Sequence, residues 1–161
     1  GLGDVYKRQV YMRFGRLAVP VINDESTYKF EIGKGVELRS GKDITIIATG
    51  LPVSESLEAA KFLAEDGIDA QVINIHTIKP LDEELVVKAA QATGRVFTVE
   101  EHSIIGGLGS AVMECLAEKN PVKVTRIGVR DTFGESGPAK DLLHKYELDA
   151  EGIYKQIKAA L

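Results

Sequence analysis

Short apolar runs rich in β-branched residues alternate with amphipathic helical patterns from residue 43 to residue 161. Four runs have the length and composition of buried strands: residues 44–49, 70–75, 95–99 and 122–128. Such runs are typical of parallel strands that are covered on their faces. Because a helical pattern separates each run from the next, the pattern predicts βαβ units with crossover helices, in a doubly wound or one-side-covered α/β domain.

The helices expected between and after these strands have recognisable ends. Three are crossover helices, and two more, the first over residues 139–146, follow the last strand. The start and stop signals are the N-caps Asp82 and Asp149 and the C-terminal glycines Gly67 and Gly94. The third crossover helix begins at residues 107–110 and places Cys115 on its apolar face, so we expect this thiol to lie in the core and not to act as a nucleophile.

Residues 10–42 do not follow this pattern. Residues 10–14 alternate like a strand, residues 20–25 have turn chemistry, and three glycines then punctuate a possible hairpin over residues 33–41. We interpret residues 10–42 as the end of a preceding domain plus a linker. The first nine residues contain DVYKRQ, which resembles the translation of a sequencing-library adaptor, so residues 1–9 are expected to be a non-native tail; an ordinary N-terminal tail is the alternative.

Composition excludes several classes of protein. The length of 161 residues fits one ordinary domain, and 20 basic against 24 acidic residues give a net charge of -4, so nucleic acid is not an expected partner. No apolar run approaches the roughly 20 residues of a membrane-spanning helix, so no membrane association is expected. The single cysteine cannot form an internal disulfide, and a reducing cytoplasm fits best.

Two segments could carry chemistry. Residues 106–110 (GGLGS) form a glycine-rich turn before a helix, but they match the dinucleotide fingerprint poorly, and close backbone packing is the better interpretation. Glu100, Glu101 and His102 lie at the carboxyl end of the third expected strand, where open parallel sheets bind ligands, so a general acid or base is conceivable. Neighbouring strand residues point to opposite faces, however, and the alternative is that these carboxylates accept backbone hydrogen bonds in the next turn or lie at an interface. No histidine has the spacing of a zinc site.

Four separated motifs occur in a fixed order: residues 43–50 (DITIIATG), 76–82 (HTIKPLD), 99–112 (VEEHSIIGGLGSAV) and 126–137 (RIGVRDTFGESG). Together they resemble the C-terminal domain of transketolases, especially the small subunit of split bacterial and archaeal transketolases. The resemblance covers residues 10–161. It implies a three-layer, open, mostly parallel α/β sheet with crossover helices over residues 43–161, and it makes residues 10–42 the end of the pyrimidine-binding domain plus a linker.

The resemblance also implies a function. Transketolases transfer a two-carbon ketol unit between sugar phosphates with thiamine diphosphate and Mg²⁺ or another divalent cation. The Gly-Asp-Gly cofactor motif and the pyrimidine-activating glutamate of the family belong to upstream domains, and this chain contains no Gly-Asp-Gly. We therefore expect no catalytic, cofactor-binding or metal-binding residue in this segment and no activity without the N-terminal transketolase domains or subunit.

Five residues are expected to contribute to that complete enzyme. By its position in VYMRFGR, Arg13 corresponds to an arginine that binds the substrate phosphate, with a surface salt bridge as its alternative. The residues expected at an interface, in a homodimer or a split-subunit hetero-oligomer, are Glu101, His102, Ile104 and Ile105. The similar domains of 1-deoxyxylulose-5-phosphate synthase and of the 2-oxoacid dehydrogenase β subunit are alternative interpretations, as is an assembly module without any enzyme partner.

Overall fold

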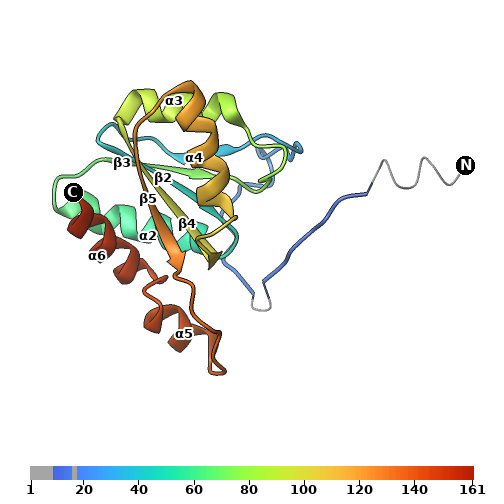
Figure 1. Ribbon diagram of the computed structural model, residues 1–161, viewed down its shortest axis with the longest axis vertical. Helices are drawn as coiled ribbons and strands as arrows, with labels where there is room; N and C mark the ends of the chain where they lie inside the picture. Colours follow the sequence, from blue (N-terminus) through green and yellow to red (C-terminus); the bar gives the residue numbers. More distant parts are fainter. Residues whose placement is uncertain (1–8, 16–17) are drawn as a thin grey trace, which may run out of the picture.

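Five strands form one sheet in the order β1-β3-β2-β4-β5 in the computed structural model, which describes residues 9–15 and 18–161 (Figure 1). The strands are β1 (Val36–Arg39), β2 (Ile44–Thr49), β3 (Ala70–Asn74), β4 (Arg95–Ser103) and β5 (Lys123–Val129). The strands β2 to β5 are parallel to their neighbours, and β1 pairs antiparallel with β3 at one edge. The mostly parallel sheet expected from the sequence is confirmed.

Helices cover both faces of this sheet, so the domain has three layers. The helices are α2 (Pro52–Glu65), α3 (Glu83–Thr93), α4 (Leu108–Lys119), α5 (Ala139–Lys145) and α6 (Ala150–Ala160). One apolar core lies between the sheet and α2 with α6, and a second lies between the sheet and α3 with α4 (Figure 1). Neighbouring residues of β2 alternate between them: Ile46 packs in the first core and Ile47 in the second, both without solvent exposure. This alternation is the reason why both faces need a covering layer.

The helix ends follow the predicted chemistry. The Asp82 carboxylate accepts the backbone N–H of Leu85 at 3.3 Å, and the Asp149 carboxylate accepts that of Gly152 at 2.8 Å, so both are N-caps. Gly94 ends α3 in a left-handed conformation with φ of 67°, which glycine adopts without steric cost. Cys115 is buried on α4, which confirms its place in the core.

Two predictions for the N-terminal part are wrong. The described residues of 10–14 form no strand, and their side chains are exposed, because no other described strand lies beside them to supply hydrogen bonds. Residues 33–41 do not form a hairpin either, since β1 pairs with β3, which lies more than 30 residues further along the chain. Gly41 serves this pairing by close approach: a Cβ there would lie 2.2 Å from the backbone nitrogen of Gln71.

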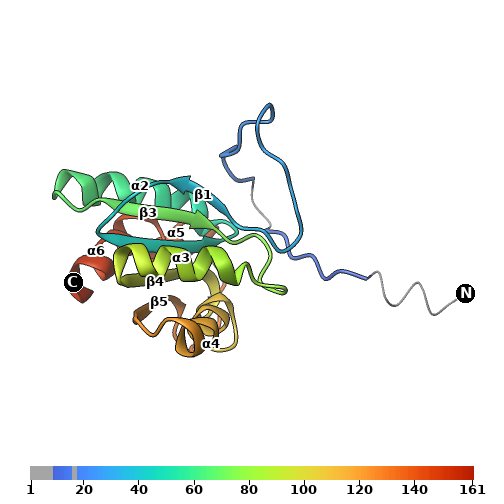
Figure 2. The same ribbon diagram turned by 90° about the horizontal axis from the view of Figure 1, so that it is seen from above.

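The linker between residues 18 and 35 lies outside the three layers, as Figure 2 shows from above. It reaches the sheet through a few contacts, which are described below. The predicted tail over residues 1–9 lies outside the described residues except for Gln9. No helix among the described residues is long and apolar enough to span a membrane.

Candidate functional site

The carboxyl ends of four parallel strands meet at one edge of the sheet, where open α/β sheets bind their ligands. Glu100, Glu101 and His102 lie at this edge because β4 continues to Ser103, four residues beyond its predicted end. Ile104 and Ile105 lie in the turn that follows β4, and Arg13 reaches the same edge from the N-terminal segment. This edge, called here the carboxyl edge, is therefore the candidate site.

The two adjacent glutamates at the carboxyl edge differ in their surroundings. Glu100 is 2% exposed, and its carboxylate accepts the backbone N–H groups of Leu108 and Gly109, both at 2.9 Å. Glu101 is half-buried and His102 is exposed. Glu100 has the structural role that was its alternative, since its carboxylate accepts backbone hydrogen bonds at the turn that follows β4. Its negative charge lies at the N-terminus of α4, where the helix dipole stabilises it.

The glycine-rich turn before α4 is not a phosphate cradle. A phosphate at a helix N-terminus needs free backbone N–H groups, and here the Glu100 carboxylate already occupies two of them. A Cβ at residue 107 would lie 1.9 Å from Oε2 of Glu100, so Gly107 is required for this close approach. A Cβ at residue 109 would lie 2.7 Å from Cγ of Arg126. The prediction of close packing in this turn is confirmed at Gly107 and Gly109, whereas a Cβ at Gly106 would meet no atom within 4 Å.

The turn that carries Ile104 and Ile105 is held by several hydrogen bonds. The backbone N–H of Ile104 donates to the carbonyl of Val129 at 3.1 Å, and the Arg126 guanidinium donates to the carbonyl of Ile104 at 2.8 Å. The backbone N–H of Ile105 donates to Oγ of Ser103 at 3.1 Å, yet the Ile105 side chain is 62% exposed. A fixed turn thus presents an exposed apolar side chain. That Glu101, His102, Ile104 and Ile105 lie at an interface stays a prediction.

Arg13 reaches the same edge from the N-terminal segment. Its Nη2 donates a hydrogen bond to the backbone carbonyl of Glu101 at 3.2 Å, although the two residues are 88 positions apart in the chain. This contact uses one of the five N–H donors of the guanidinium, so others are available for an anion. The structure thus brings together Arg13 and Glu101, which the sequence analysis had assigned to different roles. A phosphate-binding role for Arg13 stays a prediction.

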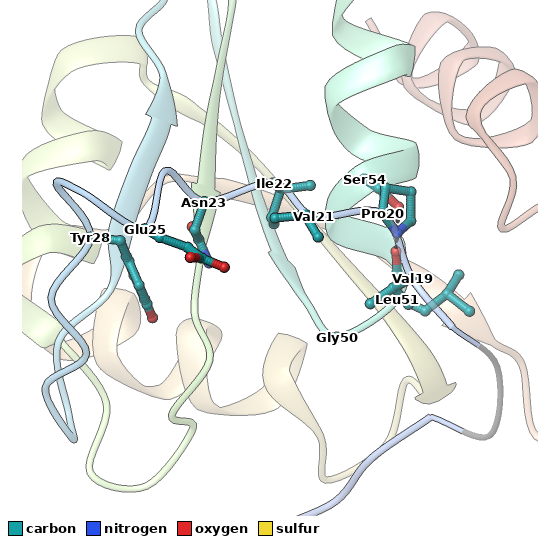
Figure 3. A pocket seen from close by; sticks show the side chains of 10 residues that line it. All are labelled: Val19, Pro20, Val21, Ile22, Asn23, Glu25, Tyr28, Gly50, Leu51 and Ser54. Carbon is teal, nitrogen blue, oxygen red and sulfur yellow. Dashed lines mark hydrogen bonds between the residues drawn. The ribbon is translucent and has the colours of Figure 1, made fainter.

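The linker covers the ends of β2 and β3. The Phe30 ring packs against the His76 ring, with centroids 4.7 Å apart, and the backbone N–H of Gly35 donates to the Asp82 carboxylate at 3.0 Å. A hollow of about 380 Å³ remains between residues 19–28 and the start of α2 (Figure 3). Its lining is mainly apolar, and its one charged side chain, Glu25, is acidic. The hollow therefore offers no cation for a sugar phosphate.

His76 also lies at this edge. The only expectation for it from the sequence was that it would not bind zinc, because no histidine has the spacing of a zinc site. Its Nδ1 lies 2.8 Å from Oγ1 of Thr77, and burial lowers the pKa of the imidazole below its ordinary value. It is therefore neutral at pH 7. Its contact with Phe30, 46 residues earlier in the chain, has no signal in the sequence.

The described residues do not fit the cofactor that the resemblance implies. Within residues 9–15 and 18–161, no group of three or more His, Cys, Asp or Glu side chains is placed to hold a metal ion. The N-terminus of α4, at the glycine-rich turn, is filled by the Glu100 carboxylate.

Comparison with known proteins agrees with this arrangement. The family described as "Transketolase, C-terminal domain" matches residues 33–153, which include the whole sheet and the helices up to the first residues of α6. The chain belongs to the transketolase C-terminal domain family. The family match and the three-layer fold confirm the resemblance expected from the four motifs.

Several relatives within the transketolase superfamily are similar over most of this chain. A 6-deoxy-6-sulfo-D-fructose transketolase subunit of Clostridium sp. is 49% identical over 91% of this chain and 45% of its own length. A putative transketolase C-terminal section of Methanocaldococcus jannaschii is 49% identical over 94% of this chain and 48% of its own length. A 1-deoxy-D-xylulose-5-phosphate synthase of Geobacter sulfurreducens is 42% identical over 94% of this chain and 24% of its own length.

A solved structure described as a split gene transketolase, inactive beta4 tetramer, matches with a TM-score of 0.86 and 48% identity. The match covers 91% of this chain and 48% of that one. The chain thus spans about half the length of the split transketolase relatives that it matches.

Proposed function

We propose that this chain is the C-terminal part of a transketolase subunit of the split type, whose complete enzyme transfers a two-carbon ketol unit between sugar phosphates. The observation that carries the proposal is the family match over residues 33–153, together with 48% and 49% identity to split transketolase chains. Residues 10–42 are then the end of the pyrimidine-binding domain plus a linker, and residues 43–161 are the C-terminal domain. The single buried cysteine agrees with a reducing cytoplasm.

The role of this segment in that enzyme is assembly. Its carboxyl edge, the ordinary place for a ligand, is filled by the Glu100 carboxylate and covered in part by the linker. Apolar side chains such as Ile105 remain exposed there, which is typical of protein interfaces. The solved relative is described as a tetramer of β chains, and we propose that this subunit also associates with copies of itself and with an N-terminal subunit.

The proposal places thiamine diphosphate and Mg²⁺ on domains outside this segment. The transketolase and 1-deoxyxylulose-5-phosphate synthase families depend on thiamine diphosphate, which supplies the chemistry of carbon–carbon bond cleavage and formation. The described residues contribute no donor set for it. Their part is to fix the position of the domains that bind it.

Arg13 is the residue of this chain proposed to touch substrate. It is exposed, and its contact with the Glu101 carbonyl fixes one edge of the guanidinium. In the complete enzyme, Arg13→Ala should lower kcat/KM for phosphorylated sugars about 10-fold to 100-fold more than for unphosphorylated analogues, because a charge-assisted contact is worth about 1.5 to 3 kcal/mol. Arg13→Lys should recover part of the loss. Equal losses for both substrate classes would make Arg13 a structural residue.

Reconstitution tests the function itself. This chain is mixed with the diphosphate-binding and pyrimidine-binding domains, and transfer from xylulose 5-phosphate to ribose 5-phosphate is measured with thiamine diphosphate and Mg²⁺. We expect transfer by the mixture and none by this chain alone. Absence of any thiamine-dependent activity in a stable mixture would favour an assembly module without an enzyme partner.

A second candidate function rests on the Geobacter sulfurreducens relative, a 1-deoxyxylulose-5-phosphate synthase that is 42% identical to this chain. The same mixture distinguishes the two activities. Formation of 1-deoxyxylulose 5-phosphate in place of ketol transfer would assign the chain to the synthase.

A further inference from the structure

The end of β4 places one backbone carbonyl beyond its neighbouring strand. The last pair between β2 and β4 joins Thr49 and Glu100, and the chain then turns at Gly50, with φ of 68°, into α2. Strand β4 continues past this point. The Glu101 carbonyl therefore lies beyond the end of β2, where a strand neighbour would have donated to it, and it accepts the Arg13 Nη2 hydrogen bond at 3.2 Å instead.

The direction of this carbonyl is set by a close approach between β4 and β5. Residues 100–102 lie opposite the single residue Gly128, because the strand pairs on either side of them leave no other residue of β5 between. A Cβ at Gly128 would lie 2.9 Å from the carbonyl oxygen of His102 and 3.1 Å from that of Glu100, so both carbonyls face β5. Successive carbonyls along a strand point to opposite sides, and the Glu101 carbonyl therefore faces away from β5.

The same end of β4 is anchored to α4. The Glu100 carboxylate accepts the backbone N–H groups of Leu108 and Gly109, both at 2.9 Å, and Glu100 is buried. The end of the strand is thus held from two directions, by α4 on one face of the sheet and by Gly128 along its edge. The Glu101 carbonyl between these two contacts has little freedom to move.

A guanidinium held by a carbonyl keeps its charge for another partner. Arg13 belongs to none of the ion pairs among residues 9–15 and 18–161. The carbonyl dipole orients the guanidinium without neutralising it, whereas a carboxylate would compete with an incoming anion. An exposed arginine loses side-chain entropy when it binds an anion, and a guanidinium that is already held at one edge loses less.

We infer that Gly128 and Glu100 are positioning residues for Arg13. Together they fix the Glu101 carbonyl, which holds the guanidinium in the orientation that binds the phosphate of the substrate. The inference rests on the proposed function, in which Arg13 contacts that phosphate. Both positioning residues are buried, so they act through the Glu101 carbonyl and not by contact with the substrate.

Kinetics of the complete enzyme test the inference. Gly128→Ala inserts a Cβ against the two carbonyl oxygens on the β5 side and displaces the end of β4. We expect the KM for phosphorylated sugars to rise about 3-fold to 10-fold, the contribution of one hydrogen bond, with kcat and the KM for unphosphorylated analogues unchanged. Glu100→Gln keeps the shape of the side chain, loses one of its two acceptors and should act in the same direction. The control is Gly134→Ala, at a position with open space around it, which should change none of these constants.

A double variant separates positioning from a purely structural effect. In the Arg13→Ala enzyme, Gly128→Ala should raise the KM for phosphorylated sugars no further, because the guanidinium through which it acts is gone. An equal rise in the wild-type and Arg13→Ala enzymes would overturn the inference. Equal rises for phosphorylated and unphosphorylated substrates would overturn it as well.

NMR of the ¹⁵N-labelled 161-residue chain provides a measurement that needs no activity. The heteronuclear NOE of the Arg13 Nε–H group reports order on the picosecond to nanosecond timescale. We expect an ordered side chain in the wild type, loss of order in Gly128→Ala and Glu100→Gln, and no change in Gly134→Ala. A disordered Arg13 side chain in the wild type, or an unchanged one in both variants, would overturn the inference. Failed ketol transfer with these NMR responses present would overturn the proposed function and leave the positioning of Arg13 standing.

Discussion

The described N-terminal residues 9–15 and 18–35 differ from residues 36–161 in what their apolar side chains do. Tyr11 and Phe14 are 92% and 81% exposed, whereas Ile46 and Phe97 have no exposure. Both regions have an alternating or apolar pattern that predicts strands. In residues 36–161, neighbouring strands supply backbone hydrogen-bond partners and helices cover the apolar side chains, so the pattern forms strands. No described element does this for residues 9–15 and 18–35, and no strand forms there. An apolar pattern shows what a segment can bury, and the rest of the molecule decides whether it does.

The largest expected effect contrasts two phenylalanines from these regions. Phe97→Ala should lower the free energy of unfolding by about 3 to 5 kcal/mol, because it opens a cavity in the core between the sheet and α2 with α6. Phe14→Ala removes a side chain that is already in solvent and should change stability by less than about 0.5 kcal/mol. Urea denaturation of both variants measures the contrast. Comparable losses would mean that Phe14 is packed in solution.

The next effect contrasts two adjacent carboxylates at the carboxyl edge. Glu100→Ala leaves the backbone N–H groups of Leu108 and Gly109 without their charged acceptor and should cost about 3 kcal/mol. Glu101→Ala should cost less than about 0.5 kcal/mol in this chain, because only the backbone carbonyl of Glu101 takes part in its contact with Arg13. Thermal unfolding distinguishes them. A neutral Glu100→Ala would show that water satisfies the N-terminus of α4.

Substitutions of two glycines compare a position packed against the Glu100 carboxylate with an exposed position. Gly107→Ala inserts a Cβ against the Glu100 carboxylate and should cost about 1 to 3 kcal/mol, as over-packing does. Gly134→Ala, in the exposed β5–α5 connection with open space around its Cα, serves as the control and should be near neutral. A Gly107→Ala variant as stable as Gly134→Ala would mean that the turn before α4 is free to move.

The smallest expected effect concerns the contact between the two regions, in which the Phe30 ring packs against the His76 ring. Burial lowers the pKa of His76, so its unfolded form takes up a proton at a higher pH than its folded form does. The titration of His76 therefore does not change the free energy of unfolding above about pH 6.5, and it lowers the free energy of unfolding as the pH falls below that value. Phe30→Ala exposes the ring, and NMR titration should show the pKa of His76 rising toward its ordinary value.

His144 provides the control for that titration. A hydrogen bond to the Asp149 carboxylate, 2.7 Å away, raises the pKa of His144, and this pair lies far from the linker in the chain. Its stabilisation is complete below about pH 6.5 and is lost as the pH rises through the raised pKa of the folded state. Phe30→Ala should leave this titration unchanged. A shift at His144 as large as that at His76 would contradict a local contact between linker and sheet.

Most of the sheet could be predicted from local patterns. The bounds of β2 agree with the predicted residues 44–49, and the caps Asp82 and Asp149 lie where their helices begin. The end of β4 could not be predicted, because Glu100 and His102 are polar, and only pairing with β5 extends the strand to Ser103. The prediction of a hairpin around residues 33–41 was wrong because β1 pairs with β3. This pairing joins segments more than 30 residues apart, so local turn chemistry does not indicate it.

The sequence by itself determined the α/β class, the order of strands and helices from β2 to α6, the core position of Cys115 and the family, since each depends on residue type and spacing along the chain. Only the tertiary structure decided the role of Glu100, the contact of Arg13 with the Glu101 carbonyl and the exposure of Phe133. Each of these depends on which distant backbone group lies within hydrogen-bond distance or which surface lacks a cover. Such distances are set when the strands pair and the helices pack, and no local pattern contains them.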